Sequence, residues 1–155
     1  MCLICERIEW IKQNENPYFV KELETGYVVI GDHQHFKGYT LFLCKEHVTE
    51  LHDLPPLFRN QHLSEMADVS ELVSEAFFAD KINIESLGNG DSHLHWHIFP
   101  RKSGDLGDYG RNGKGPVWWL PFDEMYADEK CVKGQELEKL KKRLLAEFEN
   151  RKKNK

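Results

Sequence analysis

Alternating and continuous apolar runs in the first third of the chain predict a series of strands. Residues 18–25 alternate β-forming and polar side chains, and residues 27–30 form an unbroken apolar run. Gly26 lies between these runs, so together they predict a β-hairpin. Residues 39–44 predict a third strand after a polar loop, whereas residues 6–13, at the start of the chain, predict a short helix.

Two later stretches repeat apolar residues at the three-to-four-residue spacing of an amphipathic helix. The first follows Pro55 and Pro56, and proline is favoured in the first turn of a helix. Its apolar positions are Leu63, Met66, Val69, Leu72, Val73, Ala76 and Phe77. The second spans residues 134–150 near the end of the chain. We expect both helices to pack on one side of the sheet, with His52 and His62 at the surface.

A histidine-rich segment follows the amphipathic helix that begins after Pro55 and Pro56. Residues 81–87 predict a fourth strand, and the glycine-rich turn 88–91 leads into a fifth at 92–100. In the fifth strand, histidines at positions 93, 95 and 97 alternate with Leu94, Trp96 and Ile98. Successive side chains of a strand point to opposite faces, so the three imidazoles are predicted to share one face. The order of elements favours an α+β fold with a five-stranded, mostly antiparallel sheet.

Three imidazoles on one face allow three interpretations. Histidines occur half-buried in sheets without any chemical task, but three such neighbours cannot all be protonated without mutual repulsion. A His-x-His pair on a strand is also a common arrangement for chelating a metal ion. Neutral imidazole is, in addition, suited to nucleophilic and acid–base chemistry near pH 7. The pattern therefore favours a chemical role and leaves its kind open.

The composition predicts one globular domain and restricts its partners. The chain has 155 residues, of which 40% are hydrophobic and 30% charged, and it contains no apolar run of membrane-spanning length. A net charge of -5 argues against binding nucleic acid through its backbone. Arg151, Lys152, Lys153 and Lys155 form the one basic cluster and suggest a solvated tail. The first residues lack the apolar core of a signal peptide, so we expect a cytoplasmic protein without membrane contact.

The cysteines suggest metal binding rather than disulfides. Cys2 and Cys5 form a Cys-x-x-Cys pair, and in a reducing compartment that spacing indicates a metal site more often than a disulfide. Cys44 and Cys131 are expected to be unpaired structural thiols.

The segment 93–99 matches at every position the signature of the histidine triad (HIT) family, in which three histidines alternate with apolar residues. The flanking segments 81–83, 87–89 and 115–119 also resemble a bacterial branch of that family. The resemblance runs from about Cys2 to Trp119. It implies a single HIT-like domain over 1–155, with a core at about 2–119 and a C-terminal extension with a helix at about 120–155.

The resemblance implies a nucleotide hydrolase or transferase that needs no catalytic cofactor. Its substrates would be purine nucleotide conjugates such as dinucleoside polyphosphates, phosphoramidates or adenylated compounds. In such a reaction His95 attacks the α-phosphorus and forms a covalent nucleotidyl-imidazole, which water then hydrolyses. His97 would stabilise phosphoryl oxygens and help to protonate the leaving group, while His93 would orient its neighbours.

The same resemblance suggests residues that hold the nucleotide. Asp32 matches an acidic residue that grips the ribose hydroxyls, although Gly-Asp is also ordinary turn chemistry. Asn89 and Asn83 offer side-chain amides to the phosphates, although Asn-Gly is also a common tight turn. His33 and His35 are expected to be solvent-exposed. The loop 102–115 would govern which leaving groups are accepted.

A structural zinc and a homodimer complete what the resemblance implies. Some family members hold a tetrahedral zinc through a cysteine pair, a later histidine and the first triad histidine, which correspond here to Cys2, Cys5, His47 and His93. Two thiolates and two imidazoles would close the site, so that zinc would brace the fold rather than catalyse. Trp118 and Trp119 cannot both face one core, so one of them is predicted to cover a purine ring or the partner subunit.

Two rival functions remain open. A non-catalytic nucleotide-binding or interaction module would keep Asp32 and the strands but would not need His95. A metalloenzyme that uses the triad as zinc ligands would need a fourth ligand and an acidic base, and Asp91 is the nearby candidate.

Overall fold

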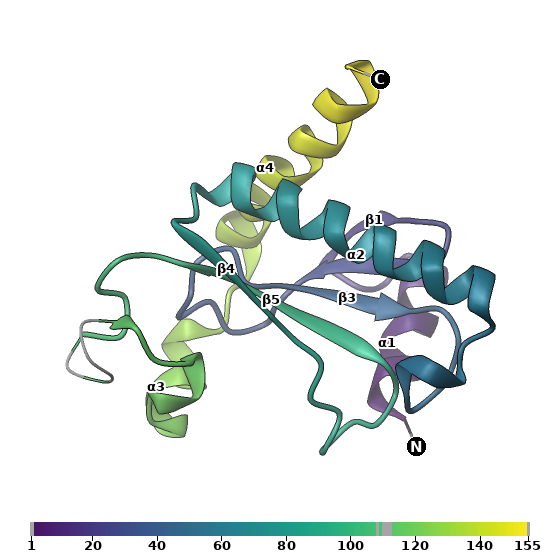
Figure 1. Ribbon diagram of the computed structural model, residues 1–155. Helices are drawn as coiled ribbons and strands as arrows, with labels where there is room; N and C mark the ends of the chain where they lie inside the picture. The colour runs from purple at the N-terminus through teal and green to yellow at the C-terminus, as the bar shows by residue number, and fades with distance from the viewer. Residues whose placement is uncertain (1, 108, 110–112, 155) are drawn as a thin grey trace.

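The computed structural model describes residues 2–107, 109 and 113–154. A five-stranded sheet with the strand order β1-β2-β3-β5-β4 forms its centre (Figure 1). The strands are β1 (Phe19–Glu22), β2 (Gly26–Ile30), β3 (Thr40–Cys44), β4 (Lys81–Glu85) and β5 (His95–Arg101). Every neighbouring pair is antiparallel. The α+β class and the antiparallel five-stranded sheet expected from the sequence are confirmed.

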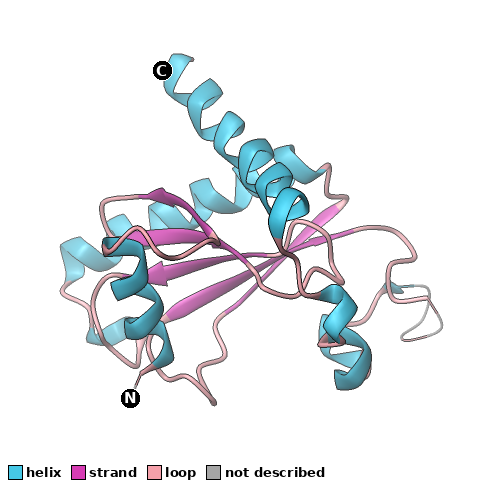
Figure 2. Cartoon of the chain, turned by 180° about the vertical axis from the view of Figure 1, so that it is seen from behind, coloured by secondary structure: helices cyan, strands magenta, loops and turns pink. Residues whose placement is uncertain are grey.

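Helices cover both faces of this sheet, not one as expected. The long helix α2 (Pro56–Phe77) and the C-terminal helix α4 (Gly134–Lys153) pack together on one face (Figures 1 and 2). Their core with the sheet includes Val28, Ile30, Phe42, Val69, Val73, Ile98, Leu137, Leu140 and Leu144. Helix α1 (Leu3–Lys12) packs on the opposite face, where its isoleucines bury Tyr27, Val29 and Leu43. The prediction overlooked this because α1 was too short to give a clear stripe.

Strand register places the triad strand between these two layers. His95 pairs with Leu43 and His97 with Leu41, which puts both histidines on the α1 face. Trp96, opposite Phe42, points to the α2 and α4 face. The predicted alternation therefore holds from residue 95 onward. However, β5 begins at His95 rather than residue 92, so His93 lies before the strand and the three imidazoles do not form one row.

Helix α1 begins at Leu3, three residues earlier than predicted. The helix is capped by Cys2, whose Sγ accepts a hydrogen bond from the backbone N–H of Cys5 at 3.4 Å. Cysteine is not among the usual capping residues, so residue 2 carries no recognisable start signal for a helix. Among the described residues, no helix has the length and apolar character needed to cross a membrane.

The C-terminal extension contributes to two cores. Leucines of α4 join the main core described above. The short helix α3 (Phe122–Met125) and the 3₁₀ turns η3 (Val117–Trp119) and η4 (Asp128–Lys130) precede α4, and a third turn, η1 (Leu51–Asp53), precedes α2. A second core, which includes Phe99 of β5, consists of Phe36, Tyr39, Phe99, Leu106, Val117, Leu120 and Met125. The extension is thus packed directly beside the triad strand.

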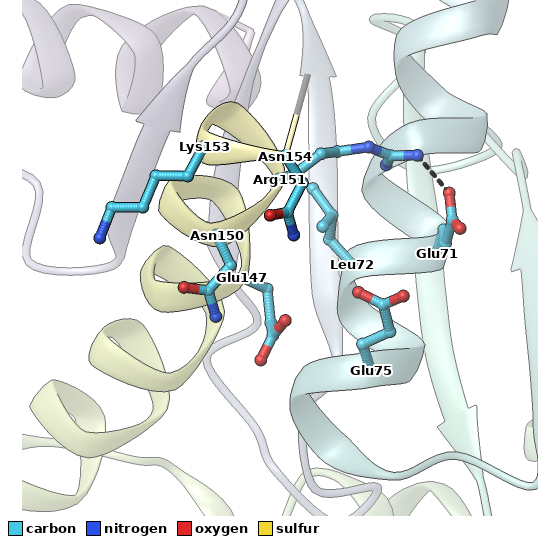
Figure 3. Close-up of a pocket in the computed structure, with 8 residues that line it drawn as sticks. All are labelled: Glu71, Leu72, Glu75, Glu147, Asn150, Arg151, Lys153 and Asn154. Atoms are coloured by element: carbon cyan, nitrogen blue, oxygen red, sulfur yellow. Dashed lines mark hydrogen bonds and ion pairs between the residues drawn. The ribbon is translucent and has the colours of Figure 1, made fainter.

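The last turns of α4 are fastened to α2 rather than frayed. Arg151 forms ion pairs with Glu71 and Asp68, and its neighbours line a polar groove between the helices (Figure 3). Helix α4 continues to Lys153. The prediction of a solvated basic tail is therefore wrong for Arg151. It was based on the charge of neighbouring residues and could not include the acidic partners on α2.

His62 of α2 is fully buried, contrary to the expected surface position. Its Nε2 accepts a hydrogen bond from the indole N–H of Trp96 at 2.9 Å, so the ring proton is on Nδ1. Nδ1 lies 2.9 Å from the Thr25 hydroxyl, which in turn donates to the carboxylate of Glu65. Glu65 also accepts from the backbone N–H of Glu24 and Thr25, at 2.8 and 2.9 Å. The side-chain polar groups of His62, Thr25 and Glu65 in this hydrogen-bond network therefore all have partners.

Candidate functional site

His95 and His97 lie side by side on the α1 face, with ring centroids 4.8 Å apart. They open into a cavity of about 240 Å³. Its wall also includes Leu3, Ile4, Arg7, Val29, Asp32, His33, Tyr39, Leu41, Leu43, Asp91 and Tyr126. Apolar strand residues form its floor, while charged and aromatic groups lie around them. Such a site suits a ligand that combines charged and flat apolar parts.

The tautomer of His95 follows from one hydrogen bond. His95 is 6% exposed, and its Nδ1 lies 2.6 Å from the backbone carbonyl oxygen of His93. A carbonyl oxygen can only accept, so Nδ1 carries the proton and donates it. The lone pair is therefore on Nε2, for which the described residues offer no hydrogen-bond partner. This arrangement leaves a buried imidazole with a free nucleophilic nitrogen.

His97 is held by a tyrosine that the sequence analysis did not single out. The Tyr39 hydroxyl lies 2.6 Å from Nδ1 of His97, and the two rings are stacked. Burial lowers the pKa of His97 to about 4, with a smaller contribution from His95. Burial also raises the pKa of Tyr39, so the phenol stays neutral. The pair consequently presents neutral hydrogen-bonding groups, and His97 does not carry a positive charge at pH 7. The sequence signal for Tyr39 is its alternation with Leu41 and Leu43, which places the three side chains on one face of the strand.

His93 belongs to a different cluster. Its Nε2 donates to the carbonyl oxygen of Cys44 at 2.8 Å, which leaves the Nδ1 lone pair free. Nδ1 lies 3.6 Å from Cys2 Sγ, 3.4 Å from Cys5 Sγ and 3.2 Å from His47 Nδ1. These four residues are the ones that the sequence analysis grouped, and their ligand atoms all lie within 4.8 Å of one another. Sequence positions 2, 5, 47 and 93 are thus brought together.

The donor set fits a tetrahedral zinc ion. Zn–S and Zn–N bonds of about 2.3 and 2.0 Å at tetrahedral angles put sulfur and nitrogen roughly 3.5 Å apart and two nitrogens roughly 3.3 Å apart. Four of the six separations between ligand atoms, from 3.1 Å between Cys5 Sγ and His47 Nδ1 to 3.6 Å, agree with these values, and all six lie within 4.8 Å. The hydrogen bond to Cys44 also orients the His93 ring, as outer partners of metal ligands do. All four positions are supplied by protein, which is typical of a structural site.

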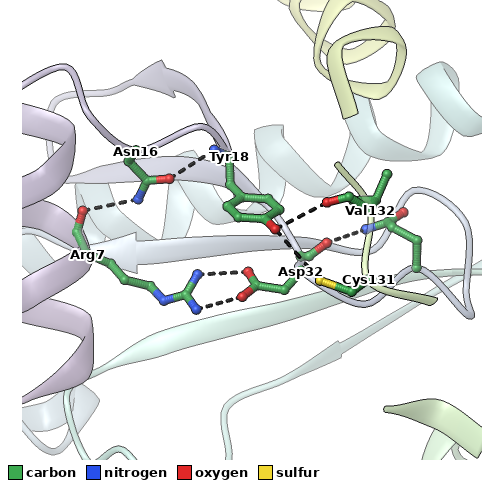
Figure 4. A network of polar contacts seen from close by, with 8 residues as sticks. Arg7, Asn16, Tyr18, Asp32, Cys131 and Val132 are labelled. Carbon is green, nitrogen blue, oxygen red and sulfur yellow. Dashed lines mark hydrogen bonds and ion pairs between the residues drawn. The ribbon is translucent and has the colours of Figure 1, made fainter. Parts of the chain in front are cut away.

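Asp32 lies in the cavity and is paired with an arginine. Both carboxylate oxygens accept from the guanidinium of Arg7, at 2.7 and 2.6 Å (Figure 4). Arg7 comes from α1 and also lines the cavity. The bidentate pair fixes the direction of the carboxylate while leaving further lone pairs to accept hydrogen bonds. Nothing in the local sequence pairs position 7 with position 32, so this partner was missed.

The two asparagines lie in different surroundings. Asn83 on β4 accepts a hydrogen bond from Arg101 at 2.8 Å, and Arg101 is also paired with Asp105. Asn89 lines a neighbouring cavity of about 270 Å³, which also contains Ser92. His95 lines both that cavity and the one that holds Asp32. His95 therefore stands at the boundary between two ligand-sized spaces.

The remaining predicted positions are distributed around the triad strand. Trp118 donates its indole N–H to Glu85 at 2.6 Å and meets the His97 ring edge-to-face, whereas Trp119 is 52% exposed. His33 is half-buried and lines the cavity, contrary to its expected exposure. Of the loop expected to choose leaving groups, positions 108 and 110–112 lie outside the described residues.

Solved structures share this fold. A histidine triad protein from Bradyrhizobium japonicum is 23% identical with a TM-score of 0.67, and the match covers 83% of this chain and 88% of that one. A hypothetical histidine triad nucleotide-binding protein from Sulfolobus tokodaii is 22% identical with a TM-score of 0.67, and the match covers 94% of this chain and 93% of that one. A zinc-bound histidine triad family protein from Mycobacterium smegmatis is 22% identical with a TM-score of 0.62, covering 99% and 97%. At these identities the likeness shows the fold alone.

Sequence comparison identifies the family directly. No curated protein matches the chain. The model of the HIT domain matches residues 14–104, which is more than half of the 155 residues and includes all three triad histidines. The chain therefore belongs to the HIT domain family.

Proposed function

We propose that this protein is a nucleotide hydrolase or transferase that acts at the α-phosphate of a nucleotide conjugate. The observation that supports it best is the His95 tautomer. With Nδ1–H donated to the His93 carbonyl, the Nε2 lone pair is available in a cavity beside a neutral His97. A non-catalytic binding module would not need such a nitrogen.

In the proposed first step, the Nε2 lone pair of His95 forms a bond to the α-phosphorus. The bond from phosphorus to the leaving group breaks, and the leaving group keeps the electron pair. In the second step water attacks the same phosphorus, loses a proton to solvent, and the phosphorus–nitrogen bond breaks to restore His95. Two moderate displacements thus replace one difficult displacement.

His97 would assist both steps as a neutral donor. Its Nδ1 is engaged by Tyr39, and its neutral ring can donate to a phosphoryl or leaving-group oxygen when Nε2 carries the proton. Asp32, whose direction is fixed by Arg7, would accept the ribose hydroxyls. Asn89, on the other side of His95, would hold phosphate oxygens or the leaving group. Asn83 would have an indirect role, because its side chain is hydrogen-bonded to Arg101.

We further propose that Cys2, Cys5, His47 and His93 hold a structural zinc ion. Zinc bound there would tie the first helix to His93, which lies two residues before the triad strand. The backbone carbonyl of His93 is the group that orients His95. The four ligands would therefore support the site without taking part in the displacement.

Trapping the covalent intermediate tests the proposed chemistry. The purified protein would be mixed with a dinucleoside polyphosphate, a nucleoside phosphoramidate or an adenylated compound and then denatured at mildly alkaline pH. We expect the intact mass to increase by one nucleotidyl group, located on His95. His95→Ala should abolish the adduct and turnover while keeping nucleotide binding, because it removes the attacking nitrogen and leaves the pocket.

Two outcomes would contradict the proposal. Near wild-type turnover in His95→Ala would exclude His95 as the nucleophile. Tight nucleotide binding by the wild-type protein without turnover of any of the three substrate types would favour the binding-module alternative.

A symmetric homodimer is the assembly we propose. The sheet ends in β4, an edge strand, and large apolar side chains are exposed, among them Leu57 at 85%, Phe78 at 74% and Trp119 at 52%. Exposed apolar surface of this kind usually marks a contact. Sedimentation should give twice the 18.2 kDa chain mass, and Trp119→Ser should weaken the association. A fully active monomer would exclude the dimer.

A further inference from the structure

The cavity wall includes residues from outside the segment that matches the HIT domain. That match spans residues 14–104. Leu3, Ile4 and Arg7 precede it, and Tyr126 follows it in the C-terminal extension. The reactive histidines lie inside the matched segment. Residues from both flanks of the matched segment therefore complete the wall of the cavity.

The C-terminal extension is fastened to the loop that carries Asp32. The N–H of Val132 donates to the backbone carbonyl of Asp32 at 2.9 Å (Figure 4). The N–H of Gln34 donates to the carbonyl of Lys130 at 2.8 Å. Between these bonds, His33 and Cys131 form an antiparallel bridge. The extension thus runs alongside the Asp32 loop in a fixed register.

The ring of Tyr126 is positioned by contacts within the extension and by its contact with His33. The backbone N–H of Tyr126 bonds to the carbonyl of Phe122 at 2.9 Å, and Met125 beside it is buried in the core that also contains Tyr39. The Tyr126 ring meets the His33 ring edge-to-face, with centroids 5.2 Å apart. Both rings are half-buried and line the cavity. The end of the cavity beyond Asp32 is therefore lined by two aromatic rings, one from the Asp32 loop and one from the C-terminal extension.

The sheet register gives the order of groups along the cavity. His95 lies level with Leu43, and His97 with Leu41 and Val29. Gly31, which bonds to the Tyr39 carbonyl, is the next level, and Asp32 and His33 continue beyond it. A nucleotide with its α-phosphate at His95 and its ribose at Asp32 would extend its base toward His33 and Tyr126.

We propose that Tyr126 and His33 form the nucleobase-binding end of the cavity, so that the C-terminal extension determines substrate choice. This inference rests on the proposed function, because it places the phosphate and ribose at His95 and Asp32. Aromatic side chains bind bases by stacking and edge contacts, and removal of one such ring typically weakens binding roughly 5- to 100-fold.

Calorimetric binding of two probes to the full-length protein tests the inference. Adenosine 5′-monophosphate carries a base, whereas ribose 5-phosphate has the same sugar and phosphate without one. We expect Tyr126→Ala to weaken binding of the nucleotide roughly tenfold and to leave binding of ribose 5-phosphate unchanged. Tyr126→Phe, which keeps the ring, should bind both probes like the wild type. Tyr126→Leu keeps apolar packing without a flat ring and should behave like Tyr126→Ala even if the latter folds poorly.

The results separate the inference from the proposed function. Equal weakening of both probes in Tyr126→Leu would show a structural role, and no weakening of either would remove Tyr126 from the site. Both outcomes would overturn the inference while leaving His95 chemistry intact. Failure of the wild-type protein to bind either probe would overturn the proposed function together with it.

Discussion

Buried histidines lie on both faces of the sheet, and they differ in how their ring nitrogens are used. His62, on the α2 and α4 face, accepts from Trp96 at one nitrogen and faces Thr25 with the other, both at 2.9 Å. His97, on the α1 face, is engaged by Tyr39 at Nδ1 only. Burial lowers the pKa of each to about 4. The lowered pKa alone therefore does not distinguish a structural histidine from a reactive one.

The distinguishing feature is a ring nitrogen without a protein partner beside a cavity. A buried polar group that is fully hydrogen-bonded stabilises a fold and has no capacity left for a ligand. His95 and His97 each keep one nitrogen for which the described residues provide no partner. By this criterion His93 belongs with His62, because its two nitrogens face the Cys44 carbonyl and the metal-ligand cluster.

Replacement of His97 should give the largest effect among the tests of this comparison, and the effect should be on turnover. His97→Ala removes a donor next to the reacting phosphate and should lower turnover roughly a hundredfold or more, though less than His95→Ala. Its unfolding free energy should change less than that of the His62 variant described next. Steady-state kinetics and urea denaturation measure the two effects. A turnover equal to that of the wild type would place His97 with the structural histidines.

His62 should show the reverse behaviour. His62→Leu leaves the indole N–H of Trp96 without an acceptor and removes the N–H that faces the Thr25 hydroxyl oxygen, so we expect a loss of roughly 2–4 kcal/mol of stability. Turnover of the folded variant should stay within a few-fold of the wild type. His52→Leu is the matched control, because the His52 side chain is 79% exposed and its loss should cost less than about 0.5 kcal/mol. Similar denaturation midpoints for both variants would contradict the buried network.

The metal cluster tests whether His93 belongs to the structural group. Cys5→Ser should lower the zinc content from about one ion per chain and lower the thermal midpoint. At free zinc a hundred times above the dissociation constant, bound zinc would stabilise the fold by about 2.7 kcal/mol. Cys131→Ser, outside the cluster, should retain the metal. A chelator-free preparation without zinc, measured by elemental analysis, would contradict the zinc proposal but not the role of His95.

The smallest of the expected effects is on the pH dependence of stability, and it tests the structural role of His62. For His62 the folded pKa is about 4, below the ordinary value of 6.5, so the unfolded state binds more protons between these values. The contribution of neutral His62 to the free energy of unfolding is complete above pH 6.5 and is lost as the pH falls toward 4. Between pH 7 and pH 5 we expect a loss of roughly 1–2 kcal/mol from this residue. Chelated wild-type protein and His62→Leu, compared by urea denaturation, should differ in this slope, and identical slopes would exclude His62.

Much of the site could be predicted because neighbouring residues encode it. Alternation along the fifth strand identified which side chains share a face, and the register confirms this for His95, Trp96 and His97. The Cys-x-x-Cys spacing and the family resemblance grouped four residues whose ligand atoms the structure brings together. The unbroken and alternating apolar runs likewise predicted all five strands, since burial of one face or both leaves a periodic trace.

The sequence by itself determined the strand alternation, the α+β class and the identity of the chemical groups. Only the tertiary structure decided which nitrogen of each histidine is free, that His62 is buried, and that Arg7 pairs with Asp32. It also brought Tyr126 of the C-terminal extension to the cavity. Periodicity reports on which face a side chain occupies, because that depends on a few neighbouring residues. Hydrogen-bond partners come from positions far apart in the chain, so they are fixed only when the elements pack together.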